Sequence, residues 1–100
     1  MTAWVYMLCC SDGSYYVGSH RGEYVEQRVH EHQSGNGGAY TKRRLPVALV
    51  WAQRFERITD AISAERQVKG WSRKKKEALI SGDWDSLKQF SKRRGGTPKL

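Results

Sequence analysis

Apolar residues are concentrated near the start of the chain, where their pattern predicts a β-hairpin. Residues 2–9 are almost all apolar and rich in aromatic and β-branched side chains, which is typical of a central strand. Turn residues follow at 11–13, and residues 14–18 form the second predicted strand. A flexible glycine-rich loop at 34–38 comes later, and a third strand is predicted from Pro46 through Trp51.

The remaining apolar positions are spaced as in helices. Val25 and Val29 form a short apolar stripe on one predicted helix, and Gly35 is expected to end that helix. The predicted helices span residues 24–33, 58–71 and 72–81. A last helical turn is expected to pack on the body through Trp84, Leu87 and Phe90. The resulting order, ββαβαα with short connections, indicates an α/β fold with a small sheet.

The length of the hairpin loop decides whether two tyrosines lie together. A two-residue loop at 12–13 places Tyr6 and Tyr16 on opposite faces of the sheet. A three-residue loop at 11–13 places Tyr6 opposite Gly18 and both tyrosines on one face. We favour the longer loop because Ser-Asp-Gly suits a type I turn followed by a left-handed glycine, although Asp-Gly also suits the shorter turn. Two tyrosines on one face either pack a core, with hydroxyls reaching water, or form a site.

The helix predicted at 58–71 carries a carboxylate among its apolar positions. At 100° per residue, Glu65 and Lys69 fall in the middle of the apolar stripe. That stripe comprises Ile58, Ala61, Ile62, Ala64 and Val68. An ionised carboxylate in such a place costs several kcal/mol unless it is paired or binds a cation. Two readings remain open: an ion pair whose charged ends reach water, or a cleft in which Glu65 holds a metal ion.

The first predicted helix repeats this theme. Arg28 and His32 are four residues apart and lie beside Val25 and Val29 rather than opposite them. Such a pair either bridges to the sheet or lines a pocket, and a histidine alone is more often structural. Together with the tyrosines and the glutamate, however, the pair completes the set that phosphodiester cleavage needs. That set is a metal-binding carboxylate, a cation for the developing charge and a proton acceptor.

The charge balance points to a polyanionic partner. The chain has 100 residues, with 18 lysines and arginines against 10 acidic residues and a formal net charge of +8. Nucleic acid is the usual partner of so basic a protein, although a basic protein without such a partner is the alternative. The expected nucleic-acid contacts are Tyr40, Lys42, Arg43, Arg44, Lys69, Lys74, Lys75 and Lys76.

Other compositional features limit the class of protein. No apolar run approaches the roughly 18 residues that span a bilayer, and the start lacks a secretory signal, so a cytoplasmic protein with no membrane contact is expected. Cys9 and Cys10 are adjacent and poorly placed to bridge each other, so two reduced thiols are expected.

Four segments in order resemble the GIY-YIG nucleases. Residues 4–6, Trp-Val-Tyr, stand where that family has Gly-Ile-Tyr, and residues 16–18, Tyr-Val-Gly, stand where it has Tyr-Ile-Gly. Residues 26–35 resemble its Arg-x-x-x-His segment, and residues 64–69 resemble its metal-binding glutamate helix. Residues 70–80 are similar to the small stand-alone bacterial members, which are UPF0213-like. The resemblance covers roughly residues 3 to 90, and Ser19 stands where some members have lysine.

The resemblance implies both a fold and an activity. It implies a three-stranded antiparallel sheet flanked by helices, with a nuclease domain over residues 1–91 and a flexible basic tail at 92–100. It implies a metal-dependent endonuclease, which is a phosphodiester hydrolase. We expect DNA as the substrate ahead of RNA, and the sequence leaves both open. The implied catalytic residues are Tyr6, Tyr16, Arg28, His32 and Glu65.

The same resemblance implies a role for some of these residues. Glu65 would hold Mg²⁺ or Mn²⁺, Arg28 would steady the phosphate, and a tyrosine or a metal-bound water would act as base. Two other classes of protein stay open. One is a non-catalytic basic nucleic-acid-binding module, and the other is an interaction protein with a solvated basic face.

Overall fold

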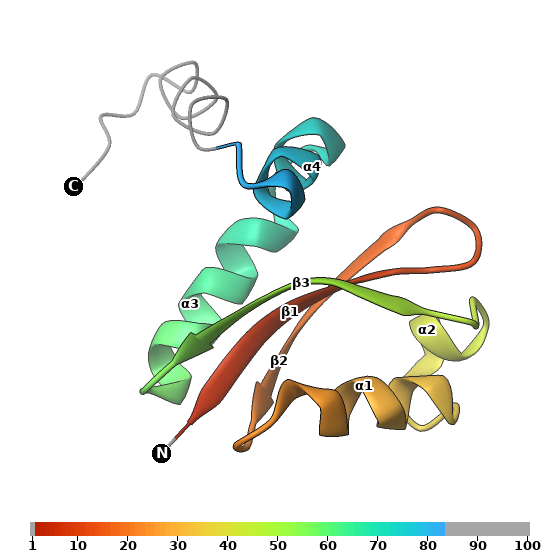
Figure 1. Ribbon diagram of the computed structural model, residues 1–100, viewed down its shortest axis with the longest axis horizontal. Coiled ribbons are helices and arrows are strands. Elements are labelled where there is room, and N and C mark those ends of the chain that lie inside the picture. Colours follow the sequence, from red (N-terminus) through yellow and green to blue (C-terminus); the bar gives the residue numbers. More distant parts are fainter. Residues whose placement is uncertain (1, 84–100) are drawn as a thin grey trace. The chain divides into compact units, whose positions relative to one another are not determined.

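The computed structural model describes residues 2–83 and has the predicted α/β fold (Figure 1). The elements are β1 (Ala3–Cys9), β2 (Tyr15–Arg21), α1 (Val25–Gln33), α2 (Ala39–Lys42), β3 (Ala48–Phe55), α3 (Ile58–Lys69) and α4 (Arg73–Ser81). The described residues fall into two compact units that divide after Lys69, the second of which holds α4. The helical turn expected at Trp84, Leu87 and Phe90 and the tail expected at 92–100 lie outside the described residues.

The three strands form one antiparallel sheet in the order β2-β1-β3, so β1 is central, as its apolar sequence predicts. β2 extends to Arg21 and β3 to Phe55, beyond the predicted ends. Both extensions are rich in polar residues, which a pattern of apolar residues does not recognise as strand. Pairing with the first residues of β1 holds them extended, and edge strands tolerate polar side chains on the open face.

The hairpin between β1 and β2 has the favoured three-residue loop. Cys10 and Ser14 close it, because the Cys10 amide donates to the Ser14 carbonyl over 2.8 Å. Gly13 ends the turn with φ of +84°, a left-handed conformation that glycine adopts without strain. Tyr6 therefore pairs with Gly18, and the prediction that Tyr6 and Tyr16 share a face is confirmed.

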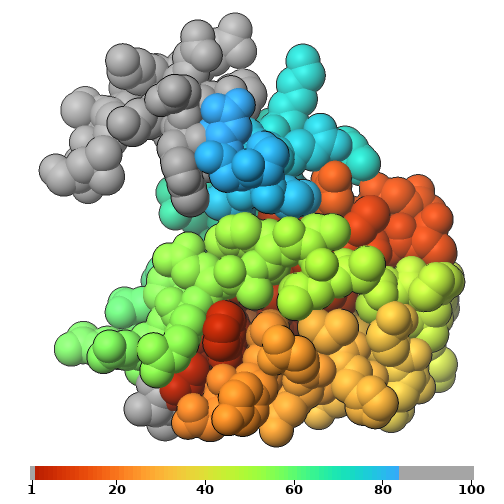
Figure 2. All heavy atoms as spheres, viewed as in Figure 1, coloured from red at the N-terminus to blue at the C-terminus, as the bar shows by residue number. Residues whose placement is uncertain are grey.

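Alternate residues of β1 serve two cores on opposite faces of the sheet. Tyr6, Leu8 and Cys10 cluster with Val25 of α1 and with Val47. The intervening residues Ala3, Val5 and Met7 are fully buried on the other face, where α3 packs on β1 and β2. Figure 2 shows the side chains of α1 (orange) and the β3 segment (green) meeting over β1 (red), of which little is visible. Each fully buried Val, Leu or Met contributes about 1.5–3 kcal/mol.

The helices agree with the sequence prediction except at two places. α3 ends at Lys69 rather than at Trp71, because Gly70 is a poor helix residue. The short α2 was not predicted, since four residues are too few to show a helical period. It nevertheless positions a residue of the candidate site.

Candidate functional site

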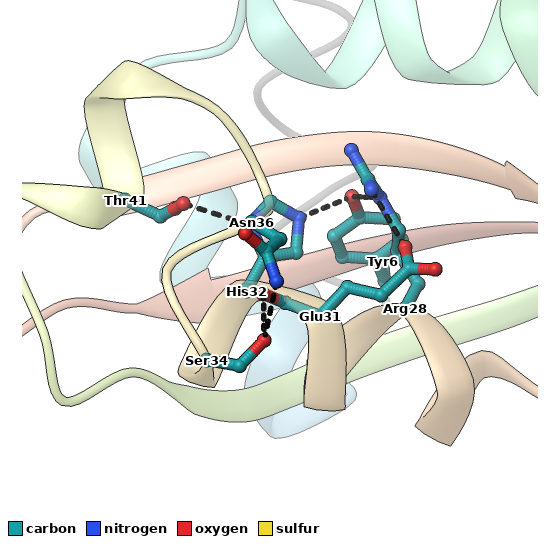
Figure 3. Close-up of polar contacts among 7 residues, drawn as sticks. All are labelled: Tyr6, Arg28, Glu31, His32, Ser34, Asn36 and Thr41. Atoms are coloured by element: carbon teal, nitrogen blue, oxygen red, sulfur yellow. Dashed lines mark hydrogen bonds and ion pairs between the residues drawn. The ribbon is translucent and has the colours of Figure 1, made fainter.

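The site is centred on the hydroxyl of Tyr6, which β1 presents to α1. Tyr6 Oη lies 2.8 Å from His32 Nε2, and Arg28 Nε donates to the same oxygen over 3.3 Å (Figure 3). Tyr6 is 1% exposed and His32 is 0% exposed. Gly18 lies opposite Tyr6, and a Cβ there would come within 2.5 Å of Tyr6 Oη. The glycine therefore leaves the space that the phenol occupies.

A residue that sequence reasoning missed, Thr41 of α2, completes this network. Its Oγ1 lies 2.7 Å from His32 Nδ1, and both residues are fully buried (Figure 3). Arg28 can only donate, so the Tyr6 hydroxyl hydrogen is free to go to His32 Nε2, and we assign the Nδ1 hydrogen of His32 to Thr41. The sequence held no signal for this contact, because Thr41 stands in a basic segment without an apolar period.

Burial keeps the phenol and the imidazole of this network neutral. It raises the pKa of Tyr6 to about 12, although the hydrogen bond from Arg28 opposes the shift. Burial and the charge of Arg28 lower the pKa of His32. At neutral pH Tyr6 therefore keeps its proton, and His32 is the neutral acceptor of that hydrogen bond.

Arg28 is the cation of the cluster, and two groups fix its orientation. In addition to its bond to Tyr6, Nη1 donates to Glu31 Oε1 over 2.7 Å. The other terminal nitrogen, Nη2, carries no dashed line in Figure 3 and has no hydrogen-bond partner among residues 2–83. The side chain is partly exposed, so this nitrogen can donate to an anion from outside.

Tyr16 differs from Tyr6 in the state of its hydroxyl. Its ring lies 6.4 Å from the ring of Tyr6 and 5.2 Å from the imidazole of His32, measured between centroids. The residue is only partly buried, and its hydroxyl makes no hydrogen bond within the part of the chain that the structure describes. Of the two tyrosines, Tyr16 is therefore the one whose hydroxyl can meet a ligand.

Glu65 lies on the other side of the sheet, on α3, and takes part in the ion pair that the sequence left open. Its Oε2 lies 2.7 Å from Lys69 Nζ, and the two side chains are 17% and 52% exposed. Burial raises the pKa of Glu65, but hydrogen bonds from Lys69 and Ser19 outweigh that effect and the pKa lies below its ordinary value. Ser19 pairs with Val5 in the sheet and so points to the α3 face. The carboxylate is therefore ionised at neutral pH.

The link between Glu65 and the tyrosines is electrostatic. Burial is the main cause of the raised pKa of Tyr6, and the charge of Glu65 is a smaller cause that acts in the same direction. Tyr16 in turn adds to the raised pKa of Lys69, whose main cause is the hydrogen bond to Glu65. The structure thus brings Tyr6, Tyr16, Arg28 and His32 into contact and holds Glu65 nearby without a direct contact.

The acidic groups fit only one mode of metal binding. Within residues 2–83 no three His, Cys, Asp or Glu side chains gather as metal ligands. A magnesium ion, however, commonly keeps several waters and binds proteins through one or two carboxylates, with substrate phosphates as further ligands. Glu65 fits that mode as the single carboxylate, and an all-protein cage does not fit.

The basic segment at 40–44 borders the cluster. Tyr40 stacks on Tyr16, and the guanidinium of Arg44 lies 3.8 Å from the centroid of the Tyr40 ring. Arg44 also binds Asp12 over 3.0 Å, so its charge already has a partner. Lys42 and Arg43 are exposed and remain suited to phosphate contacts.

The lysine run in the second unit is divided between surface and interior. Lys74 is exposed and Lys76 partly so, but Lys75 is 4% exposed and its Nζ lies over the ring of Trp71. Successive helix residues turn by 100°, so three lysines in a row cannot share one face. Lys75 is on the buried face of α4, and this burial disagrees with its prediction as a phosphate contact.

Comparisons with known proteins identify the family of the chain. The GIY-YIG catalytic domain family matches residues 2–78. The UPF0213 protein of Natronomonas pharaonis is 41% identical over 80% of this chain and 92% of its own length, and that of Streptococcus pneumoniae is 42% identical over 83% and 82%.

Solved structures of relatives show the same fold. The solution structure of the UPF0213 protein BH0048 from Bacillus halodurans is 42% identical over 81% of this chain and 84% of that one, with a TM-score of 0.53. None of the helices within residues 2–83 has the length and apolarity to cross a membrane. The chain belongs to the GIY-YIG family of nuclease-type catalytic domains, with UPF0213 proteins as its relatives.

Proposed function

We propose that this protein is an endonuclease that depends on a divalent metal ion and hydrolyses phosphodiester bonds in DNA. The observation that carries the proposal is the hydrogen-bonded cluster of Tyr6, Arg28 and His32, beside which the Tyr16 hydroxyl has no hydrogen-bond partner among residues 2–83. Membership of the family supports the nuclease chemistry. The metal requirement and the preference for DNA are the proposed parts.

Arg28 binds the scissile phosphate in this proposal. Charge builds on the phosphoryl oxygens as the attacking oxygen approaches, and a cation that is already oriented stabilises that charge without reorganising. Tyr6 and Glu31 hold Arg28 from two sides, which leaves Nη2 to face the phosphate. Tyr6 is then a positioning residue, because its hydroxyl is buried and has two partners.

Tyr16 is the residue we assign to the attacking water. In its phenolate form it accepts one proton as the water oxygen bonds to phosphorus, and the leaving ester oxygen takes a proton from solvent. Lys69 supplies a cation that interacts electrostatically with Tyr16. The ring of His32 packs against Tyr16 and fixes its orientation.

Glu65 would hold Mg²⁺ or Mn²⁺, since hard cations prefer ionised oxygen ligands. Such an ion supplies stabilisation of the negative charge on the attacking and leaving oxygens. Lys69 now occupies the position beside this carboxylate, so the metal would share Glu65 with it or displace it. The half-exposed Lys69 is free to swing towards solvent or phosphate.

A non-catalytic nucleic-acid-binding module is the second candidate. The basic composition and the exposed side chains of Lys42, Arg43 and Lys74 favour it equally. It differs from the first candidate in one respect, because it gives no role to Glu65.

The test is a panel of labelled single-stranded, duplex and branched DNA, with matching RNA, incubated with Mg²⁺ or Mn²⁺. We expect metal-dependent cleavage that falls by orders of magnitude in Glu65→Gln, while the melting temperature falls only slightly, because Lys69, the ion-pair partner of Glu65, is half exposed. Glu26→Gln is the matched control, because Glu26 is an exposed glutamate on α1.

Two outcomes would contradict the proposal in different ways. Binding without cleavage of any substrate would favour the non-catalytic module. A Glu65→Gln protein that is less stable yet cuts at the wild-type rate would reduce Glu65 to a structural partner of Lys69.

A further inference from the structure

Three flat side chains form a column that begins in the candidate site and ends at the surface. The rings of Tyr16 and Tyr40 are stacked, with 5.8 Å between centroids and 30° between planes. Arg44 Cζ lies 3.8 Å from the centroid of Tyr40. Because Tyr16 also packs against His32, the column is continuous with the catalytic cluster.

Arg44 is held in place over the ring of Tyr40. Its Nε donates to Asp12 Oδ2 over 3.0 Å, and its Nη1 donates to the backbone oxygen of Tyr40 over 2.9 Å. A guanidinium that is fixed in this way has lost its rotational freedom before a ligand arrives. Its charge is partly matched by Asp12, so what it offers beyond charge is a flat, weakly hydrated surface.

The outer part of the column is open to solvent. Tyr40 is 39% exposed even with Tyr16 and Arg44 against it, and Arg44 is also partly exposed. Lys42 and Arg43 directly precede Arg44 in the chain, and they are exposed cations that suit a phosphate backbone. A stacking surface flanked by cations is the combination that binds a nucleobase together with its phosphates.

We propose that the outer face of the Arg44 guanidinium, supported from behind by the ring of Tyr40, binds one unpaired nucleobase next to the bond that is cut. This inference rests on the proposed function and adds a substrate class to it. A base inside a regular duplex has both faces covered by its neighbours, so only an unstacked base can use the column. The preferred substrate is therefore a single strand or an unpaired region, and a continuous duplex is a poor one.

Charge alone favours the opposite substrate. A duplex carries more phosphate charge per unit length than a single strand and responds more steeply to salt. A basic surface that acted only through charge would therefore prefer the duplex. A preference for single strands would have to come from stacking, which makes the choice of substrate diagnostic.

The experiment measures binding without metal, so that no strand is cut. Labelled single-stranded DNA and the duplex of the same sequence are titrated by fluorescence anisotropy with wild type, Tyr40→Leu, Tyr40→Phe and Arg44→Lys. Stacking of one base contributes about 1–3 kcal/mol. Tyr40→Leu removes the ring that holds the Arg44 plane in place, so it should weaken single-strand binding by up to about 150-fold and leave duplex binding nearly unchanged.

The other variants separate stacking from charge and packing. Tyr40→Phe keeps the ring and should retain most of the single-strand affinity. Arg44→Lys keeps the charge but loses the plane, and should weaken single-strand binding. Tyr24→Leu is the control, because Tyr24 is an exposed tyrosine outside the column.

Two results would overturn the inference. One is a wild-type protein that binds the duplex at least as well as the single strand. The other is a Tyr40→Leu protein that loses affinity for both forms equally or for neither, which would leave the column as a packing contact between β2 and α2. Either result leaves the cleavage test of Glu65 intact, so the two proposals can fail separately.

Discussion

Removing one oxygen from each tyrosine should separate positioning from chemistry. Tyr6→Phe leaves His32 Nε2 fully buried without its partner, a loss worth about 1–3 kcal/mol. Arg28 is partly exposed and can turn to water, so it adds little to that cost. For a domain of this size each kcal/mol lowers the melting temperature by about 4–8 °C. Tyr16→Phe removes a hydroxyl without a partner among the described residues, so its stability should change by less than about 0.5 kcal/mol.

Turnover, measured where both variants are folded, should rank the two variants in the opposite way to stability. Tyr16→Phe should lose more turnover than Tyr6→Phe. Tyr16→Phe loses the proposed proton acceptor and should fall by several orders of magnitude at near-normal stability. Tyr6→Phe should retain measurable cleavage, because Glu31 still holds Arg28. Both quantities are measured on the same preparations, by thermal unfolding and by single-turnover cleavage below either melting temperature. A stable Tyr16→Phe protein that cuts at the wild-type rate would refute the assignment and return Tyr16 to core packing.

Two further predictions concern His32 and its partner. Thr41→Val should lower stability by about 1–3 kcal/mol, because it leaves His32 Nδ1 buried and unpaired, and Thr41→Ser should restore most of it. Equal loss in both variants, measured by urea unfolding, would assign the effect to packing. Burial lowers the pKa of His32, so the unfolded chain binds more protons and stability should fall as pH drops below about 6.5. His32→Gln should flatten that part of the pH profile, and an unchanged profile would show that other groups cause it.

Local rules were enough for the hairpin and for the grouping of the tyrosines. The turn sequence at 11–13 fixed the register, and the period of two in β1 then placed Tyr6 and Tyr16 on one face. The four-residue spacing of Arg28 and His32 placed both on the side of α1 that meets them. Each of these inferences depends on neighbours in the sequence or on one pair of strands, so each could be made from one sequence without the structure.

Contacts between distant elements were out of reach of such rules. Thr41 meets His32 because α2 folds back over α1, and no periodicity reports on a four-residue helix. The helical wheel placed Glu65 on the buried side of α3 but did not say which face of the sheet α3 covers. The three lysines at 74–76 were all predicted to contact phosphate, and the turn of the helix buries Lys75.

The separation of Glu65 from the tyrosines restricts where a substrate can lie. Tyr16 points from β2 towards α1, and Ser19, which bonds Glu65, points from the same strand towards α3. β2 is an edge strand, so no further strand pairs with its outer side in the part of the chain that the structure describes. If the proposed reaction uses both groups, its phosphate must lie at this edge, where groups from the two faces can converge. The half-exposed Lys69 interacts with both Glu65 and Tyr16, so it is the cation that links the groups of the two faces.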